Sequence, residues 1–230
     1  MQVSRNLQLP LALPSLFYYF CHRQQQQSHC QHHTHCQRQG HYDCRYQILL
    51  GEWKKTDRSE AAEAQRLRID IEDNHIHPRF NEVLLDNDFV LLKLSRRVPL
   101  EAYPHIRPIC LPRPGEDVKG KAAIVAGWGS IDDGHSNIAD VLLQANLTIM
   151  SNSDCLLDSK YPPHELTENM LCAKSPVGES VQDACQGDSG GPLIAWTGSE
   201  YSLVGVVSWG YGCGVAEYPG VFARVTKVYL

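Results

Sequence analysis

The sequence predicts an all-β fold, either a barrel or a sandwich built from short strands. Two observations carry this prediction. Short apolar runs recur along the chain between turn-forming Gly, Pro, Asp and Ser residues, and no long stretch has the helical period of about 3.6 residues. A length of 230 residues allows one sizeable domain or two small packed ones.

The expected strands follow one another along the chain. A strand over residues 46–50 ends at Gly51, and Leu67, Ile69 and Ile71 alternate with polar neighbours as a half-buried strand does. Further apolar runs predict strands over 89–94, 122–126, 142–150, 193–196, 203–208 and 221–225. One short helix is expected from Ser153, its N-cap, to about Lys160.

The first 44 residues differ from the rest in composition. Arg5 precedes an apolar stretch over residues 7–21, which Pro10 and Pro14 interrupt. This stretch is either a signal peptide or a disordered leader, and it is too short and broken to predict a membrane span. Residues 21–44 are rich in Gln and His and cannot build a core, so we expect a leader over 1–44.

Net charge and cysteine content limit the classes of partner and the redox compartment of the protein. The net charge of -5 and the lack of a basic stretch argue against nucleic acid or an anionic membrane as partner. Nine cysteines are typical of an oxidising compartment, and an odd number leaves at least one thiol unpaired or bonded to another chain.

One run of ten residues carries most of the chemical information. It consists of Asp183-Ala184-Cys185-Gln186-Gly187-Asp188-Ser189-Gly190-Gly191-Pro192. The glycines leave space around the serine and permit a sharp turn that directs two N–H groups at a developing oxyanion. The run closely resembles the active-site signature of the trypsin-like (chymotrypsin-fold) serine endopeptidases.

The resemblance covers residues 46–230 and implies a specific architecture. It implies two packed antiparallel β-barrels, over 45–115 and 116–230, with the active site in the cleft between them. The N-terminal barrel is expected to be incomplete because its first strands are not recognisable, and the C-terminal helix of the family is expected to be shortened.

The resemblance also implies the catalytic roles. Ser189 is the expected nucleophile, and the N–H groups of Gly187 and Ser189 are the expected oxyanion hole. Asp88 stands in a segment similar to the family's Asn-Asp-Ile-Ala-Leu-Leu motif, and a carboxylate leading into an apolar strand is costly to bury without a partner. The nearest counterpart of the catalytic base is His35, before Cys36; the alternative is that His35 is one of several histidines in a low-complexity tract.

Residues of a substrate pocket can be carried over in the same way. Asp183 resembles the acid at the floor of the primary pocket, and Gly210 and Gly220 match the small wall positions. A carboxylate in a deep pocket selects Arg or Lys, and Ala184 beside it adds no hydroxyl, which favours Arg. The resemblance further implies that Ser208, Trp209 and Gly210 pair with an extended substrate.

The resemblance assigns most cysteines of the second half. It implies disulfides Cys155–Cys172 and Cys185–Cys213. A further disulfide found in many members is absent. One of its expected positions is Ala195, and the other is Ala123 or a neighbour of Ala123. Cys110 matches the cysteine that tethers a separate propeptide or light chain, whose partner here would be a leader cysteine or absent.

The resemblance also concerns how the enzyme would be activated. In the family, a new N-terminal Ile or Val inserts its amine against the acid before the nucleophile, which is Asp188 here. The sequence contains no Ile-Val-Gly-Gly, so we expect Asp188 to lack an obvious partner. A buried carboxylate without a cation is costly.

Metal sites and modification are weaker expectations. A zinc site could draw on His29, Cys30, His32, His33, His35, Cys36 and Cys44, but no recognised spacing is present, and we predict no metal and no cofactor. Glu52, Glu60 and Glu63 could border a calcium loop, but nearby Lys and Arg favour a solvated charged loop. Asn146 begins the only N-glycosylation sequon.

These expectations favour a secreted serine endopeptidase that is made as a zymogen. It would cleave proteins or peptides after Arg or Lys and would bind serine-protease inhibitors. One alternative is a non-catalytic homologue that binds proteins through the retained cleft. Another is an incomplete gene model of an active protease. A third is a metal-binding leader on a protease-like module.

Overall fold

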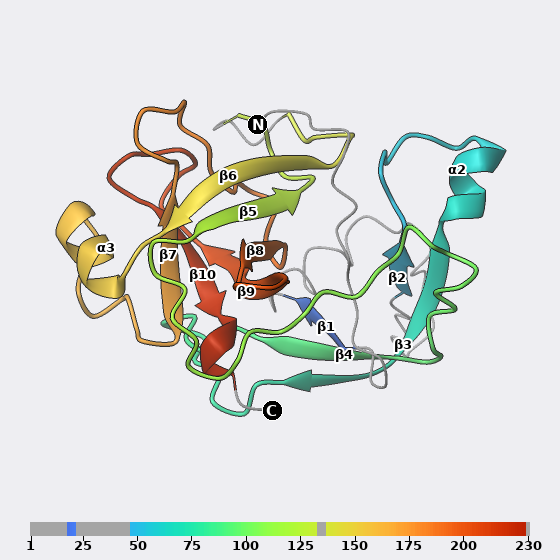
Figure 1. Cartoon of the computed structure of the whole chain (residues 1–230), viewed down its shortest axis with the longest axis horizontal. Helices are drawn as coiled ribbons and strands as arrows, with labels where there is room; N and C mark the ends of the chain where they lie inside the picture. Colours follow the sequence, from blue (N-terminus) through green and yellow to red (C-terminus); the bar gives the residue numbers. More distant parts are fainter. Residues whose placement is uncertain (1–17, 22–46, 133–136, 229–230) are drawn as a thin grey trace, which may run out of the picture.

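Strands make up most of the regular structure and form two separate groups (Figure 1). The computed structural model describes residues 18–21, 47–132 and 137–228. The C-terminal group is a closed barrel, and the N-terminal group is an open sheet. The prediction of a mostly β protein is therefore confirmed. Two barrels were expected, the N-terminal one incomplete, and the described residues form one closed barrel and one partial sheet.

Six antiparallel strands close the C-terminal barrel in the order β10-β7-β6-β5-β8-β9. Their bounds are Ala122–Gly127 (β5), Leu143–Ile149 (β6), Met170–Lys174 (β7), Pro192–Trp196 (β8), Tyr201–Trp209 (β9) and Gly220–Arg224 (β10). Alternate residues point inward and fill the barrel, and Val125, Leu147, Leu193, Val204 and Phe222 are almost completely buried. This packed core gives the loops between the strands a rigid support.

The N-terminal sheet has four strands in the order β1-β4-β3-β2. They are Tyr18–Cys21 (β1), Gln47–Leu50 (β2), Leu67–Ile76 (β3) and Val90–Leu94 (β4), all paired antiparallel. The first of them comes from the segment predicted to be a leader, where its backbone pairs with β4. Leu50, Leu67, Ile69 and Leu94 belong to a separate small core on this sheet.

Helical structure in the described residues is short. A helix at Glu60–Gln65 (α2) is capped by Ser59, a helix at Asn152–Asp158 (α3) is capped by Ser151, and a 3-10 turn (η2) spans Val225–Lys227. The predicted cap Ser153 was wrong by two residues, because the Ser151 side chain accepts the N–H of Asp154. Neither α2 nor β7 was predicted from the sequence.

The two groups meet through Phe89 and through a backbone bridge. Phe89, the residue before β4, is buried in one cluster with Ile194 and Leu203 of the barrel. Elsewhere Trp53 accepts the N–H of Leu142, and the Thr56 N–H and hydroxyl both donate to Asp140. The segment leading into β4 is thus held against the barrel by apolar packing close to Asp88.

Both disulfides implied by the resemblance are present, Cys155–Cys172 and Cys185–Cys213. The first joins α3 to β7, and the second joins the loop before β8 to the loop after β9. Cys110 is a free cysteine, and its carbonyl accepts the N–H of Leu203. A hydrogen bond with Glu200 and partial burial raise the pKa of the Cys110 thiol.

Ala123 and Ala195 lie directly opposite each other in the β5–β8 ladder, and both are buried. Opposed residues of an antiparallel pair are close enough for a disulfide. We expect the double variant Ala123→Cys/Ala195→Cys to form one and to stabilise the fold by about 2–4 kcal/mol, measured by thermal unfolding with and without reductant. The single variant Ala195→Cys is the control. Because reductant also breaks the two native disulfides, a double variant whose midpoint falls with reductant no more than that of the control would contradict the expected register.

Candidate active site

Ser189 lies in a tight turn between the second disulfide and β8. Gly187 on one side and Gly190 on the other both have left-handed backbones, with φ of 94° and 80°, which explains why glycine is needed there. The Gly190 N–H donates to the Val207 carbonyl of β9 at 2.9 Å. Within the described part of the chain, the N–H groups of Gly187 and Ser189 donate to no backbone carbonyl.

The carboxylate of Asp188 is buried beneath this turn. Its Oδ1 accepts the Gly129 N–H at 2.7 Å, and its Oδ2 accepts the Cys185 N–H at 2.9 Å. The expectation concerned a cationic partner, and the structure adds that two backbone amides hold the Asp188 carboxylate. Burial raises the pKa of Asp188, while these two hydrogen bonds and the positive charge of Lys55 act in the opposite direction.

Asp88 connects the two halves of the molecule. It is 1% exposed, just before β4, and its Oδ2 accepts the Ser208 hydroxyl of β9 at 2.7 Å. Ser208 follows Val207, whose carbonyl receives the Gly190 N–H. A short hydrogen-bonded path therefore links Asp88 through β9 to the turn that carries Ser189. The predicted base, His35, lies outside the described residues.

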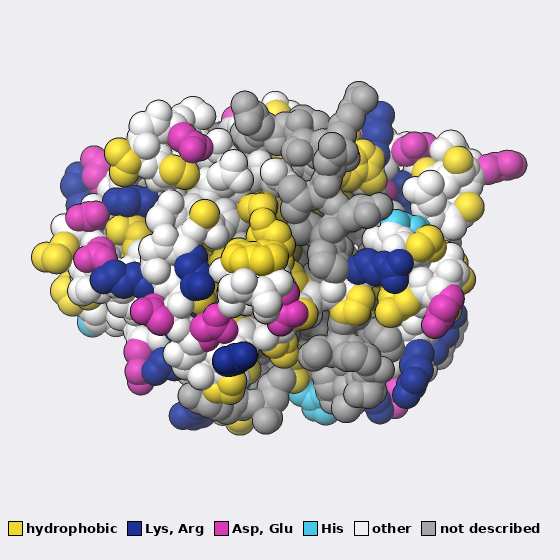
Figure 2. Space-filling view, viewed as in Figure 1, with side chains coloured by type: hydrophobic (Ala, Val, Ile, Leu, Met, Phe, Trp, Pro, Cys, Tyr) yellow, Lys and Arg dark blue, Asp and Glu magenta, His cyan; other side chains and the backbone are white. Residues whose placement is uncertain are grey.

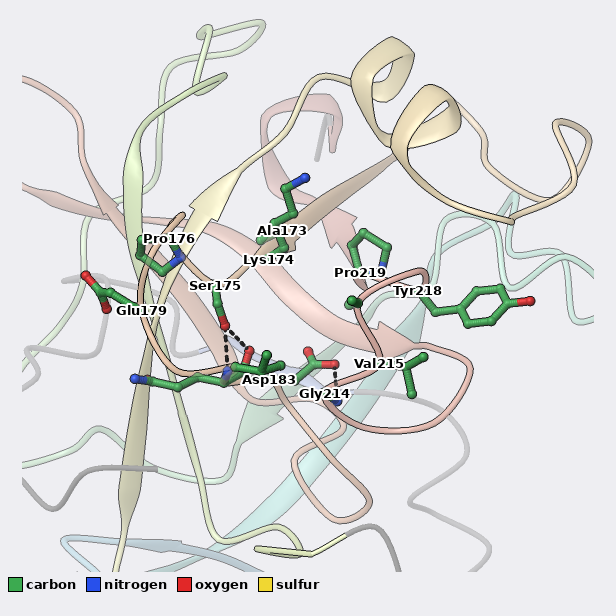
Figure 3. A pocket seen from close by; sticks show the side chains of 14 residues that line it. Ala173, Lys174, Ser175, Pro176, Glu179, Asp183, Gly214, Val215, Tyr218 and Pro219 are labelled. Carbon is green, nitrogen blue, oxygen red and sulfur yellow. Dashed lines mark hydrogen bonds between the residues drawn. The ribbon is translucent and has the colours of Figure 1, made fainter.

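Asp183 lies on the wall of a pocket of about 220 Å³ (Figure 3). The pocket is lined by residues of the segments 173–183 and 214–220, and Ser175 and Gly214 lie on its two sides. The Oδ2 atom of Asp183 accepts the Gly214 N–H at 3.0 Å, and Oδ1 accepts the Ala184 N–H at 2.9 Å. Burial raises the pKa of Asp183 to about 6, against the effect of the two amides.

The glycine positions beside Asp183 differ in their need for a small residue. A Cβ on Gly220 would lie 2.8 Å from Asp183 Oδ1, so a side chain there would collide with the carboxylate. A Cβ on Gly210 would meet only ordinary contacts, the nearest at 3.8 Å from the Tyr161 hydroxyl. Neither Ser189 nor Gly210 lines the pocket of Figure 3, whereas Asp183 and Gly220, both predicted to bind substrate, do.

Trp209 continues β9 beyond Ser208 and belongs to an aromatic group. Tyr161 is buried at the centre of this group, with ring centroids 5.1 Å from Trp209, 5.4 Å from Tyr211 and 5.2 Å from Tyr218. The Tyr161 hydroxyl donates to the Pro219 carbonyl at 2.8 Å. This packing fixes the strand predicted to pair with substrate and one wall of the pocket.

The family model named Trypsin matches residues 29–230 of this chain. The chain belongs to the trypsin family. It is 44% identical over 152 residues to trypsin-1 of Astacus astacus, covering 66% of this chain and 60% of that protein. It is 38% identical over 192 residues to trypsin-3 of Salmo salar, covering 84% and 72%.

A third relative in the trypsin family is a much longer protein. Transmembrane protease serine 9 of Rattus norvegicus is 39% identical over 155 residues, which is 66% of this chain and 14% of that protein. The chain thus spans between a seventh and about three quarters of these relatives. No helix in the described residues has the length and apolar character needed to cross a bilayer.

Sequence reasoning missed several residues that shape this trypsin-family site. Gly129 supplies an amide to Asp188, and the signal available was the Gly127-Trp128-Gly129 pattern at the end of β5. A Cβ on Gly127 or Gly129 would lie 2.0 or 2.4 Å from a carboxylate oxygen of Asp188. Both glycines are therefore needed to leave room for the buried acid.

The loop before β3 is organised by a cation of its own. Arg66 is 6% exposed, and its guanidinium donates to Glu52, to Glu63 and to the carbonyl of Lys54. The prediction of a merely solvated charged loop is corrected, because the buried Arg66 pairs with Glu52, which is 11% exposed, and with the more exposed Glu63.

This arrangement predicts stability without calcium. A guanidinium already balances Glu52 and Glu63, so we expect neither EDTA nor added Ca²⁺ to change the thermal unfolding midpoint. Arg66→Met should lower the unfolding midpoint by much more than Arg58→Met does. Arg58 is exposed, and its ion pair with Glu63 is long, at 3.9 Å. A midpoint that rises with Ca²⁺ in the parent chain would show that a metal shares this loop.

Proposed function

We propose that this chain is a secreted serine endopeptidase that cleaves proteins or peptides after Arg or Lys. The observation that carries the proposal is the bond between Asp88 and Ser208, which connects the predicted orienting acid to the strand that holds the Ser189 turn. The family match begins at residue 29, so it includes His35, which we propose as the base.

The proposed chemistry assigns one role to each of these residues. Ser189 Oγ attacks the scissile carbonyl and transfers its proton to the imidazole of His35, which Asp88 orients and stabilises when charged. The N–H groups of Gly187 and Ser189 stabilise the oxyanion of the tetrahedral intermediate. The imidazolium then protonates the leaving amine, and water hydrolyses the acyl-enzyme by the reverse sequence of proton transfers.

Specificity is proposed to come from Asp183, whose charge would pair with Arg or Lys of the substrate. A buried carboxylate whose pKa is raised gains most when a cation arrives. Ser208, Trp209 and Gly210 would pair with the extended substrate backbone. The face shown in Figure 2 has acidic and basic side chains interspersed, with no single charge covering it, which fits a protein substrate better than nucleic acid.

Further proposals concern the context of the protein. We propose as folding units a leader over 1–44, of which β1 pairs with the N-terminal sheet, a partial N-terminal barrel over 45–115 and a C-terminal barrel over 116–230. We also propose synthesis as a zymogen and regulation by serine-protease inhibitors. Cys110 is proposed to bind a propeptide or light chain through a disulfide, and Asp188 to respond to activation. Two disulfides in the described residues agree with an oxidising compartment.

Peptide amides that differ only in the residue before the scissile bond test the function. The parent chain should hydrolyse the Arg amide fastest, the Lys amide more slowly and the Phe amide not at all, and Ser189→Ala should hydrolyse none. A chain that binds the Arg peptide without turnover would instead be a binding module with a retained cleft. A preference for Phe would exclude the role given to Asp183.

A further inference from the structure

The segment leading to Asp88 has an unfavourable backbone. Leu85 and Asn87 are the non-glycine residues with positive φ in the described part of the chain, at 53° and 52°. Asparagine tolerates this region, but a bulky leucine rarely adopts it, so the surrounding structure must impose it. Such outliers are often found where a functional group must be held in place. The residue between them is Asp86.

The Asp86 carboxylate reaches from the N-terminal half to the C-terminal barrel. Its Oδ1 accepts the Thr167 hydroxyl, and both oxygens accept the Asn169 amide, at 3.1 and 3.0 Å. Its Oδ2 also accepts the Asn87 side-chain amide at 2.9 Å. Every group facing the carboxylate is a donor, so a side chain that only accepts is suited to this position.

Thr167 and Asn169, which donate to Asp86, are themselves held by hydrogen bonds to neighbouring elements. Asn169 accepts the backbone N–H of Arg224 in β10, and the Asn152 amide donates to the Thr167 carbonyl at 2.8 Å. The Arg224 guanidinium, largely buried, donates to the Met170 carbonyl and to Asn152 Oδ1. Asp86 is therefore fixed to a network that joins β10, α3 and the start of β7.

Asp88 follows Asp86 by two residues. Between them, the Asn87 amide donates to the Arg79 carbonyl at 3.1 Å, and the Asn87 carbonyl accepts the Phe89 N–H at 2.8 Å. Two residues of chain span at most about 7 Å, so Asp88 cannot shift far while Asp86 and Phe89 are held. The second attachment of Asp88, to Ser208, comes from the same barrel.

We propose that Asp86 is a positioning residue, which with Thr167 and Asn169 holds the strained turn so that both halves of the molecule place Asp88. The inference rests on the proposed function, since Asp88 orients a catalytic base only if the chain is a serine endopeptidase. Asp86 does not touch substrate in this account. It acts through the position of Asp88.

An exchange of functional groups tests the proposal. Asp86→Asn places an amide opposite the Thr167 hydroxyl and the Asn169 amide, so donors face one another. Asn169→Asp alone places two carboxylates together. The double variant Asp86→Asn/Asn169→Asp restores one carboxylate and one amide in exchanged places. Glu72→Gln, which removes an exposed ion pair with Lys93, is the control for loss of a surface acid.

Steady-state kinetics on the Arg peptide amide give the first readout. We expect Asp86→Asn to lower kcat by about 10- to 100-fold, because a small displacement of a catalytic group has effects of this size, and to leave KM within about threefold. The double variant should recover at least part of the lost kcat, and Glu72→Gln should match the parent chain. An unchanged kcat, or a double variant no better than Asp86→Asn, would overturn the proposal.

Hydrogen exchange gives a second readout that does not need activity. The amides of Asn81 and Phe89 are bonded to the Asp86 and Asn87 carbonyls, and they should exchange faster in Asp86→Asn and more slowly again in the double variant. Unchanged exchange would overturn the ordering role of Asp86. If the parent chain hydrolyses nothing while exchange behaves as expected, the proposed function fails and the ordering of the turn stands.

Discussion

Gly129→Ala should reduce the reactivity of Ser189 by about 100-fold while the protein still folds. The added Cβ would lie 2.4 Å from Asp188 Oδ2 and 2.5 Å from its Cγ, and a buried carboxylate held by two amides has little room to move. Displacing Asp188 displaces the adjoining Gly187 and Ser189 N–H groups, which are the proposed oxyanion hole. Overpacking of this kind also costs stability, about 1–3 kcal/mol.

The control for this prediction is Gly120→Ala. Gly120 has φ of 72°, so alanine there is strained, but a Cβ would meet nothing within 4 Å. This variant should lose stability by about 1 kcal/mol and keep the full rate of labelling by a fluorophosphonate. If Gly129→Ala were labelled at the rate of Gly120→Ala, Asp188 would have no part in arranging the oxyanion hole.

Asp183→Asn should weaken the binding of benzamidine, whose planar cation resembles the arginine side chain, by about 100-fold. The measurement is the rise in unfolding midpoint with added ligand, which requires no catalysis. In the parent chain this rise should shrink between pH 8 and pH 5, because the pKa of Asp183 is about 6 and the protonated acid offers no charge to the ligand.

The unliganded protein should show the opposite dependence on pH. Since burial raises the pKa of Asp183 above its ordinary value of 3.8 to about 6, its contribution favours the fold at low pH and is lost as the pH rises through 6. Asp183→Asn should remove this part of the pH dependence of stability.

For the benzamidine experiment, equal stabilisation of the parent chain and Asp183→Asn at pH 8 would exclude Asp183 as the pocket acid.

Local patterns predicted most strands of the fold but not those that depend on distant partners. The alternation of Leu67, Ile69 and Ile71 marks β3 because one face is buried and the other exposed. The strand β7 has no such alternation because four of its five residues are buried. The pairing of β1 with β4 joins segments about 70 residues apart, which no local pattern reveals.

In the candidate site, too, local motifs could be read from the sequence and contacts with distant partners could not. Ser189, Asp88 and Asp183 could be predicted because a side chain of the right chemistry stands in a recognisable motif. The partners of Asp188 were missed because they are backbone amides, one of them 59 residues away, and any residue type supplies such a group. The contacts of Asp86 were missed for a related reason, since they come from Thr167 and Asn169 in the other half.

The most direct test of the central claim is the mass of the intact chain after treatment with a fluorophosphonate. The account predicts one covalent adduct, located by peptide mapping at Ser189 and absent in Ser189→Ala. Its rate should fall strongly in His35→Ala, if His35 is the base. A folded chain that binds benzamidine but gains no adduct at Ser189 would contradict the claim that this trypsin-family protein is catalytic.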